Sequence, residues 1–264
     1  MTVSAPKMNT QRQALRDFPW WIAILGGAGV LFIIYLILNP EARDYYVSAF
    51  TFVWPGVAVT LQVTFAAYAL ALVIGLFVGL LRLSPNPVIF NIATVYVEVM
   101  RGLPMLVIVL YAGFVVRPML RDLTGGVLDP SMMAGAVAGL AIGYGAFLSE
   151  VFRSGIQSIS KGQMEAAKSL GMNYLQAMRL VILPQAIRII LPPLGNDLIA
   201  LLKDSALVAV LALPDTLQLG RLWISRTFRA LEGYNTVAIY YLGMTVALSL
   251  LVGVIERRTR QGRQ

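Results

Sequence analysis

Six long apolar runs, almost free of charged residues, constrain this chain more than any other feature. They lie at about 20–38, 55–81, 89–116, 132–152, 188–211 and 235–255. Each is close to or above the ~20 residues that cross the hydrocarbon core of a bilayer. Backbone groups inside lipid find no water to bond, so runs of this length are expected to be helices. The sequence therefore predicts an all-α integral membrane protein with six spans.

The composition excludes several classes of protein. The 264 residues are 58% hydrophobic and 13% charged, about half the charged share of a soluble domain. Cys and His are both absent, which removes disulfides, thiolate metal sites and the commonest near-neutral proton carrier. The net charge is +8, and membrane topology explains this excess better than nucleic-acid binding does. We expect no cofactor and no metal in this chain.

The distribution of Lys and Arg predicts the orientation in the membrane. The first run, Trp20–Leu38, is longer than the ~7–15 residues of a signal-peptide core and lacks a cleavage pattern after it, so it is expected to be a retained helix. With the N-terminus inside, thirteen Lys and Arg face the cytoplasm, six face outward and two lie within spans. The positive-inside rule then places both termini and the 153–187 loop in the cytoplasm.

The segment 162–178 is a polar island between apolar runs. Its charged and amide side chains make insertion into lipid unfavourable: they are Glu165, Lys168, Asn173 and Gln176. Its apolar residues recur at helical spacing: they are Ala166, Ala167, Leu170, Tyr174 and Ala177. Gly171 suits a turn between two short helices, and Pro184 limits how the next helix begins. The pattern predicts an exposed helix-turn-helix whose apolar face fits a groove on a partner or lies on the inner leaflet.

This segment resembles the EAA loop of bacterial ABC import permeases. The matching residues are Glu165-Ala166-Ala167, Gly171 and Val181-Ile182-Leu183-Pro184, with Val181 where the family has Ile. Other stretches are similar to the polar amino-acid branch of that family: Thr60–Thr64, Tyr96–Pro104, Ser149–Ile156, Pro192–Asn196 and Leu202–Ser205. The resemblance covers about 50–256.

The resemblance implies a domain organisation and a coupling segment. Residues 50–256 would form a type I ABC importer transmembrane domain, a five-helix core with a coupling helix at about 162–178. Residues 1–49 would add a cytoplasmic arm, an extra transmembrane helix and an outer loop, and 257–264 a basic cytoplasmic tail. The residues implied in coupling to an ATPase are Glu165, Ala166, Ala167, Gly171, Leu183 and Pro184.

The resemblance also implies a function and partners. The chain would be the permease subunit of an ATP-driven importer of a polar amino acid in the bacterial cytoplasmic (inner) membrane. An ABC ATPase subunit would bind ATP and Mg, because this chain lacks the phosphate-binding Gly-x-x-x-x-Gly-Lys-Ser/Thr sequence, and no enzymatic activity is expected of the permease. A second permease, identical or homologous, and an extracytoplasmic substrate-binding protein would complete the importer. The alternatives are an ion-coupled secondary transporter, which predicts repeated halves that are not visible here, or a non-transporting membrane docking protein.

Polar residues within the spans are candidates for a substrate pathway, because charges in lipid are costly and need a reason. Glu98 and Arg101 share a helical face and either neutralise each other or line the pathway. Asn196 and Lys203 share another face, beside that of Asp197 and Asp204. Lys203 and Asp204 could bind the carboxylate and the ammonium of an amino acid, or they pair with neighbouring helices.

Two further features have more than one reading. Glu150, near the inner end of the fourth run, is either a gate or cytoplasmic contact or a solvated boundary charge. Arg221, Arg226 and Arg229 form an outer basic stretch, which receives a binding protein or lies among the outer headgroups. Small residues four apart are expected to let helices approach closely in lipid: they are Gly75, Gly79, Gly135, Gly139 and Gly143.

Overall fold

The computed structural model describes residues 20–260, and all regular elements among them are helical. The chain divides into two compact units, Met1–Ser48 and Ala49–Gln264. The predicted cytoplasmic arm before Trp20 and the last four residues of the predicted tail lie outside the described residues.

The first unit contains α2 (Trp20–Leu38) and the beginning of α3 (Pro40–Leu81). Pro40 stands in the first turn of α3, where its missing N–H costs nothing. The side-chain amide of Asn39 donates to the carbonyl of Tyr35 at 3.0 Å. This bond and the proline end one helix and begin the next without an intervening loop.

The second unit contains the rest of α3 and all later elements. The α-helices are α4 (Pro87–Gly102), α5 (Met105–Tyr111), α6 (Arg117–Leu123), α7 (Met132–Gln157), α8 (Lys161–Ser169), α9 (Tyr174–Ala177), α10 (Leu183–Asp204), α11 (Thr216–Thr227) and α12 (Ala230–Arg260). Two π-helical segments, Ala112–Val116 and Met178–Ile182, and a 3₁₀ segment, Ser205–Leu211, join some of them.

Four helices in the described part of the chain are long and apolar enough to cross a membrane, and a bent pair makes up to five. The four are Pro40–Leu81, Met132–Gln157, Tyr174–Leu211 and Ala230–Arg257. The remaining predicted span coincides with α2, of which Gly26–Leu38 forms a shorter apolar helix. If the bent pair is counted as one span, the described residues agree with a five-span core, and the shorter apolar helix precedes it in the chain.

Several predicted boundaries were wrong. α3 begins at Pro40 instead of 55, because a helix continues past the edge of an apolar run until its backbone bonding is interrupted. The predicted single span 89–116 is broken between Gly102 and Met105 and bent by 105°. Pro104 explains this break, since it cannot donate to the ladder and biases Leu103 towards the extended conformation that it adopts.

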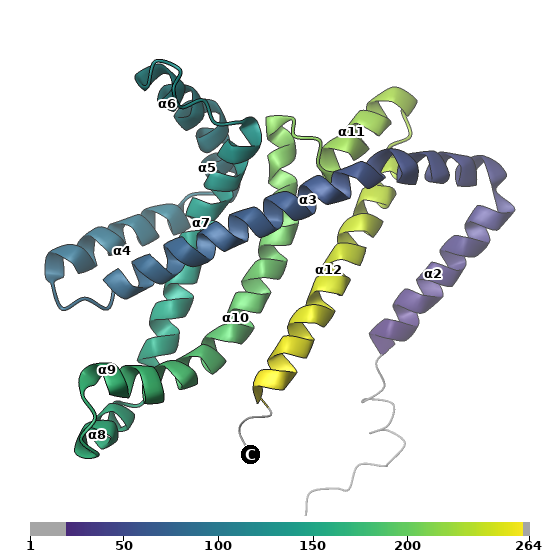
Figure 1. Cartoon of the computed structure of the whole chain (residues 1–264). Helices are drawn as coiled ribbons and strands as arrows, with labels where there is room; N and C mark the ends of the chain where they lie inside the picture. Colours follow the sequence, from purple (N-terminus) through teal and green to yellow (C-terminus); the bar gives the residue numbers. More distant parts are fainter. Residues whose placement is uncertain (1–19, 261–264) are drawn as a thin grey trace, which may run out of the picture. The chain divides into compact units, whose positions relative to one another are not determined.

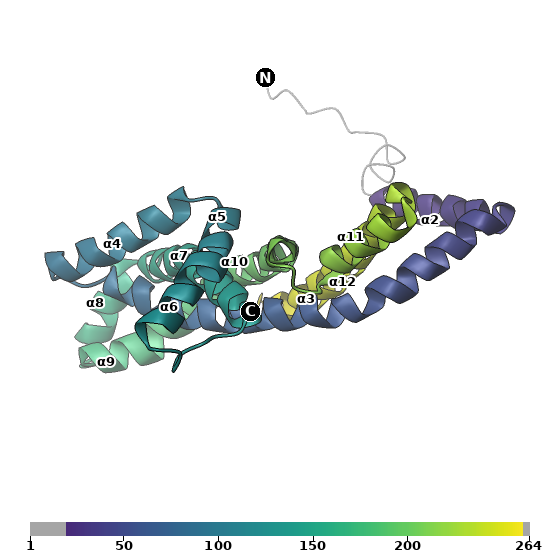
Figure 2. The same cartoon turned by 90° about the horizontal axis from the view of Figure 1, so that it is seen from above.

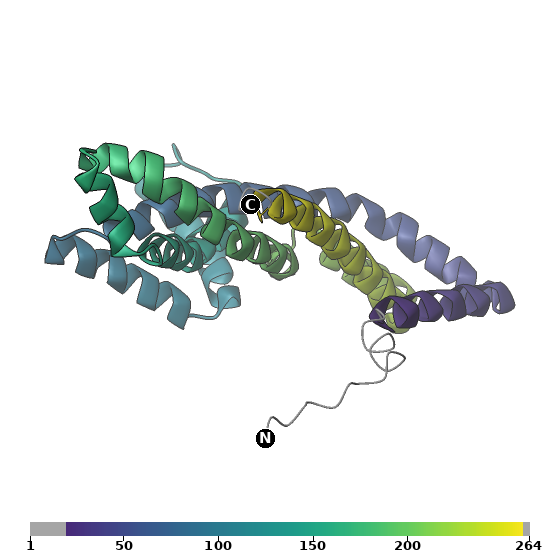
Figure 3. The same cartoon turned by 90° about the horizontal axis from the view of Figure 1, so that it is seen from below.

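α7 is the central helix of the second unit. It contacts α4, α5 and α10, while α11 and α12 pack against each other (Figures 1 and 2). The buried core joins Val63, Ala67 and Ala71 of α3 to Leu140 and Leu148 of α7 and to Leu201 of α10. α8 and α9 lie beyond the ends of α7 and α10, at the end of this unit opposite α6 (Figures 1 and 3).

Candidate functional site

The polar island folds as two short helices joined by a sharp turn, as predicted. The Ser160 side chain caps α8 by accepting from the amide of Gly162. Gly171 has φ +83°, a conformation that favours glycine strongly. Space is not the reason for this glycine, because a Cβ there would meet nothing within 4 Å. We call α8, the turn and α9 the knob, residues 161–177.

α9 has a complete capping box. The Asn173 side chain accepts from the amide of Gln176 at 2.9 Å, and the Gln176 side chain accepts from the amide of Asn173 at 3.0 Å. Such reciprocal bonds satisfy two amides that have no partner within the helix. A helix of only four residues is too short to be stable by itself, so the capping box helps to define the tip of the knob.

The knob exposes an apolar surface and one acidic side chain. Leu170, Tyr174 and Leu175 are 79%, 62% and 73% exposed, and Glu165 and Ala166 are also exposed. Ala167, however, is buried within the chain. Its small side chain therefore serves the packing of the knob itself, whereas Glu165 and Ala166 are free to meet another molecule.

The π-helical segment Met178–Ile182 joins the knob to α10. Pro184 stands in the first turn of α10, and the side chain of Gln185 donates to the carbonyl of Val181 at 2.9 Å. The same Gln185 nitrogen lies 3.3 Å from the side-chain oxygen of Gln163 in α8. Gln185 thus ties the first helix of the knob to the base of α10, a role that the sequence did not reveal.

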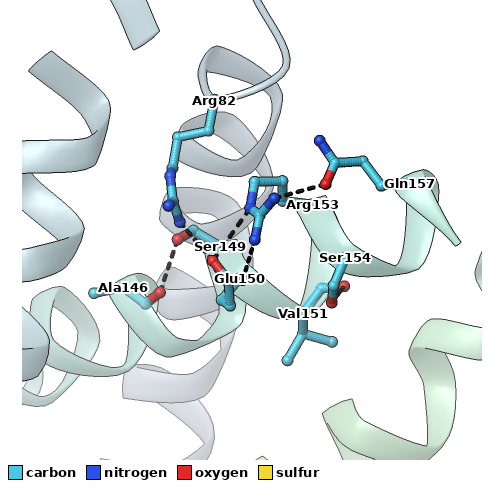
Figure 4. Close-up of polar contacts among 8 residues, drawn as sticks. All are labelled: Arg82, Ala146, Ser149, Glu150, Val151, Arg153, Ser154 and Gln157. Carbon is cyan, nitrogen blue, oxygen red and sulfur yellow. Dashed lines mark hydrogen bonds and ion pairs between the residues drawn. The ribbon is translucent and has the colours of Figure 1, made fainter. Parts of the chain in front are cut away.

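Three charged residues join the ends of α3 and α7 near the knob (Figure 4). Arg82 Nη1 lies 2.6 Å from Glu150 Oε2, and Arg153 pairs with both carboxylate oxygens of Glu150. Arg153 also donates to Gln157 Oε1 at 2.6 Å. Glu150 is therefore paired with both arginines, while its side chain remains 29% exposed. We call Arg82, Glu150 and Arg153 the inner clasp.

The predicted pathway residues lie in different environments. Among the described residues no ion pair joins Glu98 to Arg101, because the Arg101 guanidinium instead lies 5.7 Å from the ring centre of Phe147 in α7. Asp204 is half-buried and accepts from the hydroxyl of Tyr144 in α7 at 2.8 Å. Tyr144 and Phe147 are in turn ring neighbours, with centres 6.0 Å apart. α7 therefore links Arg101 of α4 to Asp204 of α10.

Lys203 and Asn196 point elsewhere. Both side chains are exposed in the single chain, in contrast to the half-buried Asp204. The expectation that Lys203 and Asp204 face different directions follows from the 100° step between helical neighbours, and their unequal burial agrees with it. Among the described residues, one apolar pocket lies between Met100 and Ile142 and another between Leu76 and Leu194, and none of the five pathway candidates lines either of them.

A buried polar cluster lies at the other end of the unit. Asp215 caps α11 by accepting from the amides of Gln218 and Leu217, and it also accepts from the Tyr241 hydroxyl. Thr216 donates from its amide to Thr60 Oγ1 at 3.1 Å. Burial raises the pKa of Asp215, and the hydrogen bonds from Gln218, Leu217 and Tyr241 only partly oppose this. The cluster was not predicted, because it joins residues 156 positions apart.

The described residues hold no group of three or more acidic side chains placed to bind a metal ion. The arrangement offers an exposed knob, a charged clasp beside it and polar side chains within apolar helices.

The comparisons with known proteins agree with this arrangement. A model of the family described as "Binding-protein-dependent transport system inner membrane component" matches residues 71–261. The chain is 36% identical over 214 residues to the probable amino-acid ABC transporter permease YckA of Bacillus subtilis, covering 80% of this chain and 91% of that one. It is likewise 36% identical over 215 residues to the glutamine transport system permease GlnP of Escherichia coli, covering 79% and 96%.

A solved structure has the same fold. A chain of an amino acid ABC transporter crystallised with histidines superposes with a TM-score of 0.72 at 38% identity, covering 80% of this chain and 96% of that chain. With the family model matching well over half of the sequence and the relatives covered almost completely, this chain belongs to the family of binding-protein-dependent transport system inner membrane components, the membrane-spanning permeases of ABC transporters.

Proposed function

We propose that this chain imports a polar amino acid across the bacterial inner membrane, as one of two permeases driven by a separate ATPase. The observation that carries this proposal is the knob: two short capped helices that present exposed apolar side chains and Glu165 beyond the membrane-spanning helices. A permease that neither binds nor hydrolyses ATP needs such a surface to receive the movement of an ATPase. The relatives named for amino-acid and glutamine transport support the choice of substrate class.

The proposed assembly has defined parts. Two ATPase subunits bind ATP and Mg and receive the knobs at 161–177, with Glu165 and Ala166 at the contact. A second permease, identical or homologous, completes the pathway, and a binding protein delivers the substrate from outside. ATP and the loaded binding protein then bias one equilibrium between outward-open and inward-open states. The knob and both termini lie in the cytoplasm.

Reconstitution tests this proposal. Proteoliposomes with this permease, its ATPase and its binding protein are expected to take up a labelled polar amino acid only with internal ATP. Glu165→Lys, which reverses a charge on the exposed face of the knob, is expected to lose the ATPase during purification. Asp122→Lys makes the same charge change in α6, at the opposite end of the unit, and is expected to retain it.

Two results contradict the proposal. Uptake that continues without ATP would indicate coupling to an ion gradient. Equal retention of the ATPase by both lysine variants would place the contact elsewhere than on the knob.

A further inference from the structure

The ends of α3 and α7 are held together by two different kinds of contact. Along the seam between them, Gly75 and Gly79 bring the backbones together: a Cβ on Gly75 would lie 2.6 Å from Leu148 Cβ, and one on Gly79 would lie 2.9 Å from the carbonyl oxygen of Ser149. Such a seam brings the two backbones close together through dispersion contacts between small residues. One turn further on, Arg82, Glu150 and Arg153 add a directional contact.

Glu150 is the shared member of the inner clasp. Its carboxylate pairs with two arginines, so the cluster carries one excess positive charge. The side chain of Arg82 is only 8% exposed, and its Nε is buried without a hydrogen-bond partner. Removing the carboxylate would therefore leave a buried guanidinium facing a second one, and a buried charge that loses its partner is strongly destabilising.

The clasp stands directly before the knob. α7 ends at Gln157, whose side chain accepts from Arg153, and only Ser158, Ile159 and Ser160 separate it from α8. The Ser158 amide and hydroxyl bond back to α7, to the carbonyls of Ser154 and Gly155. Because this connection is short and hydrogen-bonded to the end of α7, we expect it to move together with α7.

From this geometry we infer that Glu150 is a positioning residue for transport, which fixes the register of α3 on α7 so that displacement of the knob moves both helices as one body. The inference rests on the proposed function, since it assigns the route by which the knob acts on the membrane-spanning helices. α3 matters for that route because it reaches the core through Val63, Ala67 and Ala71.

The decisive measurement is the number of substrate molecules transported per ATP hydrolysed in the complete importer. Glu150→Gln is expected to lower this ratio at least about five-fold, the smallest effect typical of energetic coupling between two sites. A purely structural defect lowers the amount of active protein and so reduces transport and hydrolysis together, leaving the ratio unchanged. Glu256→Gln is the matched control and is expected to keep the wild-type ratio. Glu256 lies near the end of α12 and forms no ion pair within the described residues.

A double variant separates positioning from simple neutralisation. Arg82→Gln with Glu150→Gln removes both charges, so no unpaired guanidinium is left at position 82 and the protein folds even where the single variant does not. The ratio is expected to stay low, because two amides replace the charge-assisted bond with a weaker one. A wild-type ratio in the double variant would mean that Glu150 only neutralises a buried arginine, and would overturn the inference.

A second measurement does not depend on transport. Because the chain has no cysteine, spin labels can be attached at Phe77→Cys in α3 and Ser154→Cys in α7, both exposed. A narrow distance distribution is expected, which broadens in Glu150→Gln. If the wild-type complex does not transport, the proposed function fails, and the distance measurement alone then tests the role of Glu150. Identical distance distributions in the wild type and in Glu150→Gln would refute a positioning role.

Discussion

Gly75 shows how one missing side chain decides the distance between two helices. Its ideal Cβ would lie 2.6 Å from Leu148 Cβ and 3.1 Å from the Leu148 backbone, so any larger residue must push α3 away from α7. The small-xxx-small pattern predicts close approach in general. It does not predict the partner, because the same pattern occurs in α7 and faces α5 and the π-helical segment Ala112–Val116 instead.

Gly75→Ala is expected to destabilise the protein by about 1–3 kcal/mol, the usual cost of overpacking. Gly243→Ala in α12 is the control, because a Cβ there meets nothing within 4 Å. Its expected effect is neutral or slightly stabilising, since alanine favours a helix over glycine by roughly 0.5–1 kcal/mol. Thermal unfolding in detergent measures both. Equal midpoints for the two variants would contradict the close α3–α7 contact.

Asp215 makes a prediction about pH. Burial raises the pKa of this carboxyl in the folded protein above its value of about 3.9 in the unfolded chain. The folded state therefore prefers the protonated form, and the stability that this form contributes is lost as the pH rises from about 4 through the raised pKa. Asp215→Asn cannot ionise and keeps one side-chain oxygen to accept from the amide of Gln218, so it lacks this loss.

Thermal midpoints of the wild type and Asp215→Asn, compared between about pH 4 and 7, measure this effect. The wild type is expected to lose stability relative to the variant as the pH increases, since other titrating groups contribute equally to both proteins. A difference between the two midpoints that is independent of pH would show that Asp215 does not titrate with a raised pKa.

At the scale of elements, the broken and irregular helices carry as much information as the straight ones. α4 and α5 are separated by Leu103 and Pro104 and bent by 105°, and a π-helical segment connects the knob to α10. Both irregular places lie beside a proline, which removes a backbone donor. The regular helices, in contrast, need only apolar composition and length.

The short helix α9 depends on its cap. Asn173→Ala is expected to destabilise the tip of the knob by about 1 kcal/mol, because it removes the acceptor for the amide of Gln176. Hydrogen exchange of the amides at 174–178 is expected to accelerate by about five-fold, which corresponds to that free energy. Asn173→Asp retains the acceptor and is expected to exchange as the wild type does; acceleration in this variant too would show that the cap bond is not what holds α9.

At the scale of the whole molecule, the distribution of charge predicts the sides of the membrane. The knob and the loop between α6 and α7 lie at opposite ends of the second unit (Figure 1). Val127 in that loop is 84% exposed, and Leu175 in the knob is 73% exposed. The chain contains no cysteine, so a cysteine introduced at either position is the only one in that variant.

A membrane-impermeant thiol reagent is expected to label Val127→Cys in cells with a permeabilised outer envelope, and Leu175→Cys only in inverted membrane vesicles. The wild-type chain, which has no cysteine, is the unlabelled control. The same permease without its ATPase is used, so that the partner does not shield the knob. Labelling with the two sides exchanged would reverse the orientation that the Lys and Arg count predicts.

The helical class, the membrane environment and the knob with its glycine turn could be predicted from the residues alone. These follow from local properties: length and apolarity of each run, and residue types with a fixed backbone preference, such as Gly171 and Pro184. The family resemblance rested on the same local segments, and the match to the family over residues 71–261 confirms it.

Which residues meet across long distances in the sequence depends on the packing of the helices in three dimensions. Glu150 pairs with Arg82, which is 68 positions away in the sequence, and Thr216 bonds to Thr60, which is 156 positions away. Arg101 lies over the ring of Phe147 rather than beside Glu98. Helical periodicity places a residue on a face but does not say which helix that face meets. Pairing across helices depends on how closely the backbones approach, and that distance is set by packing in three dimensions.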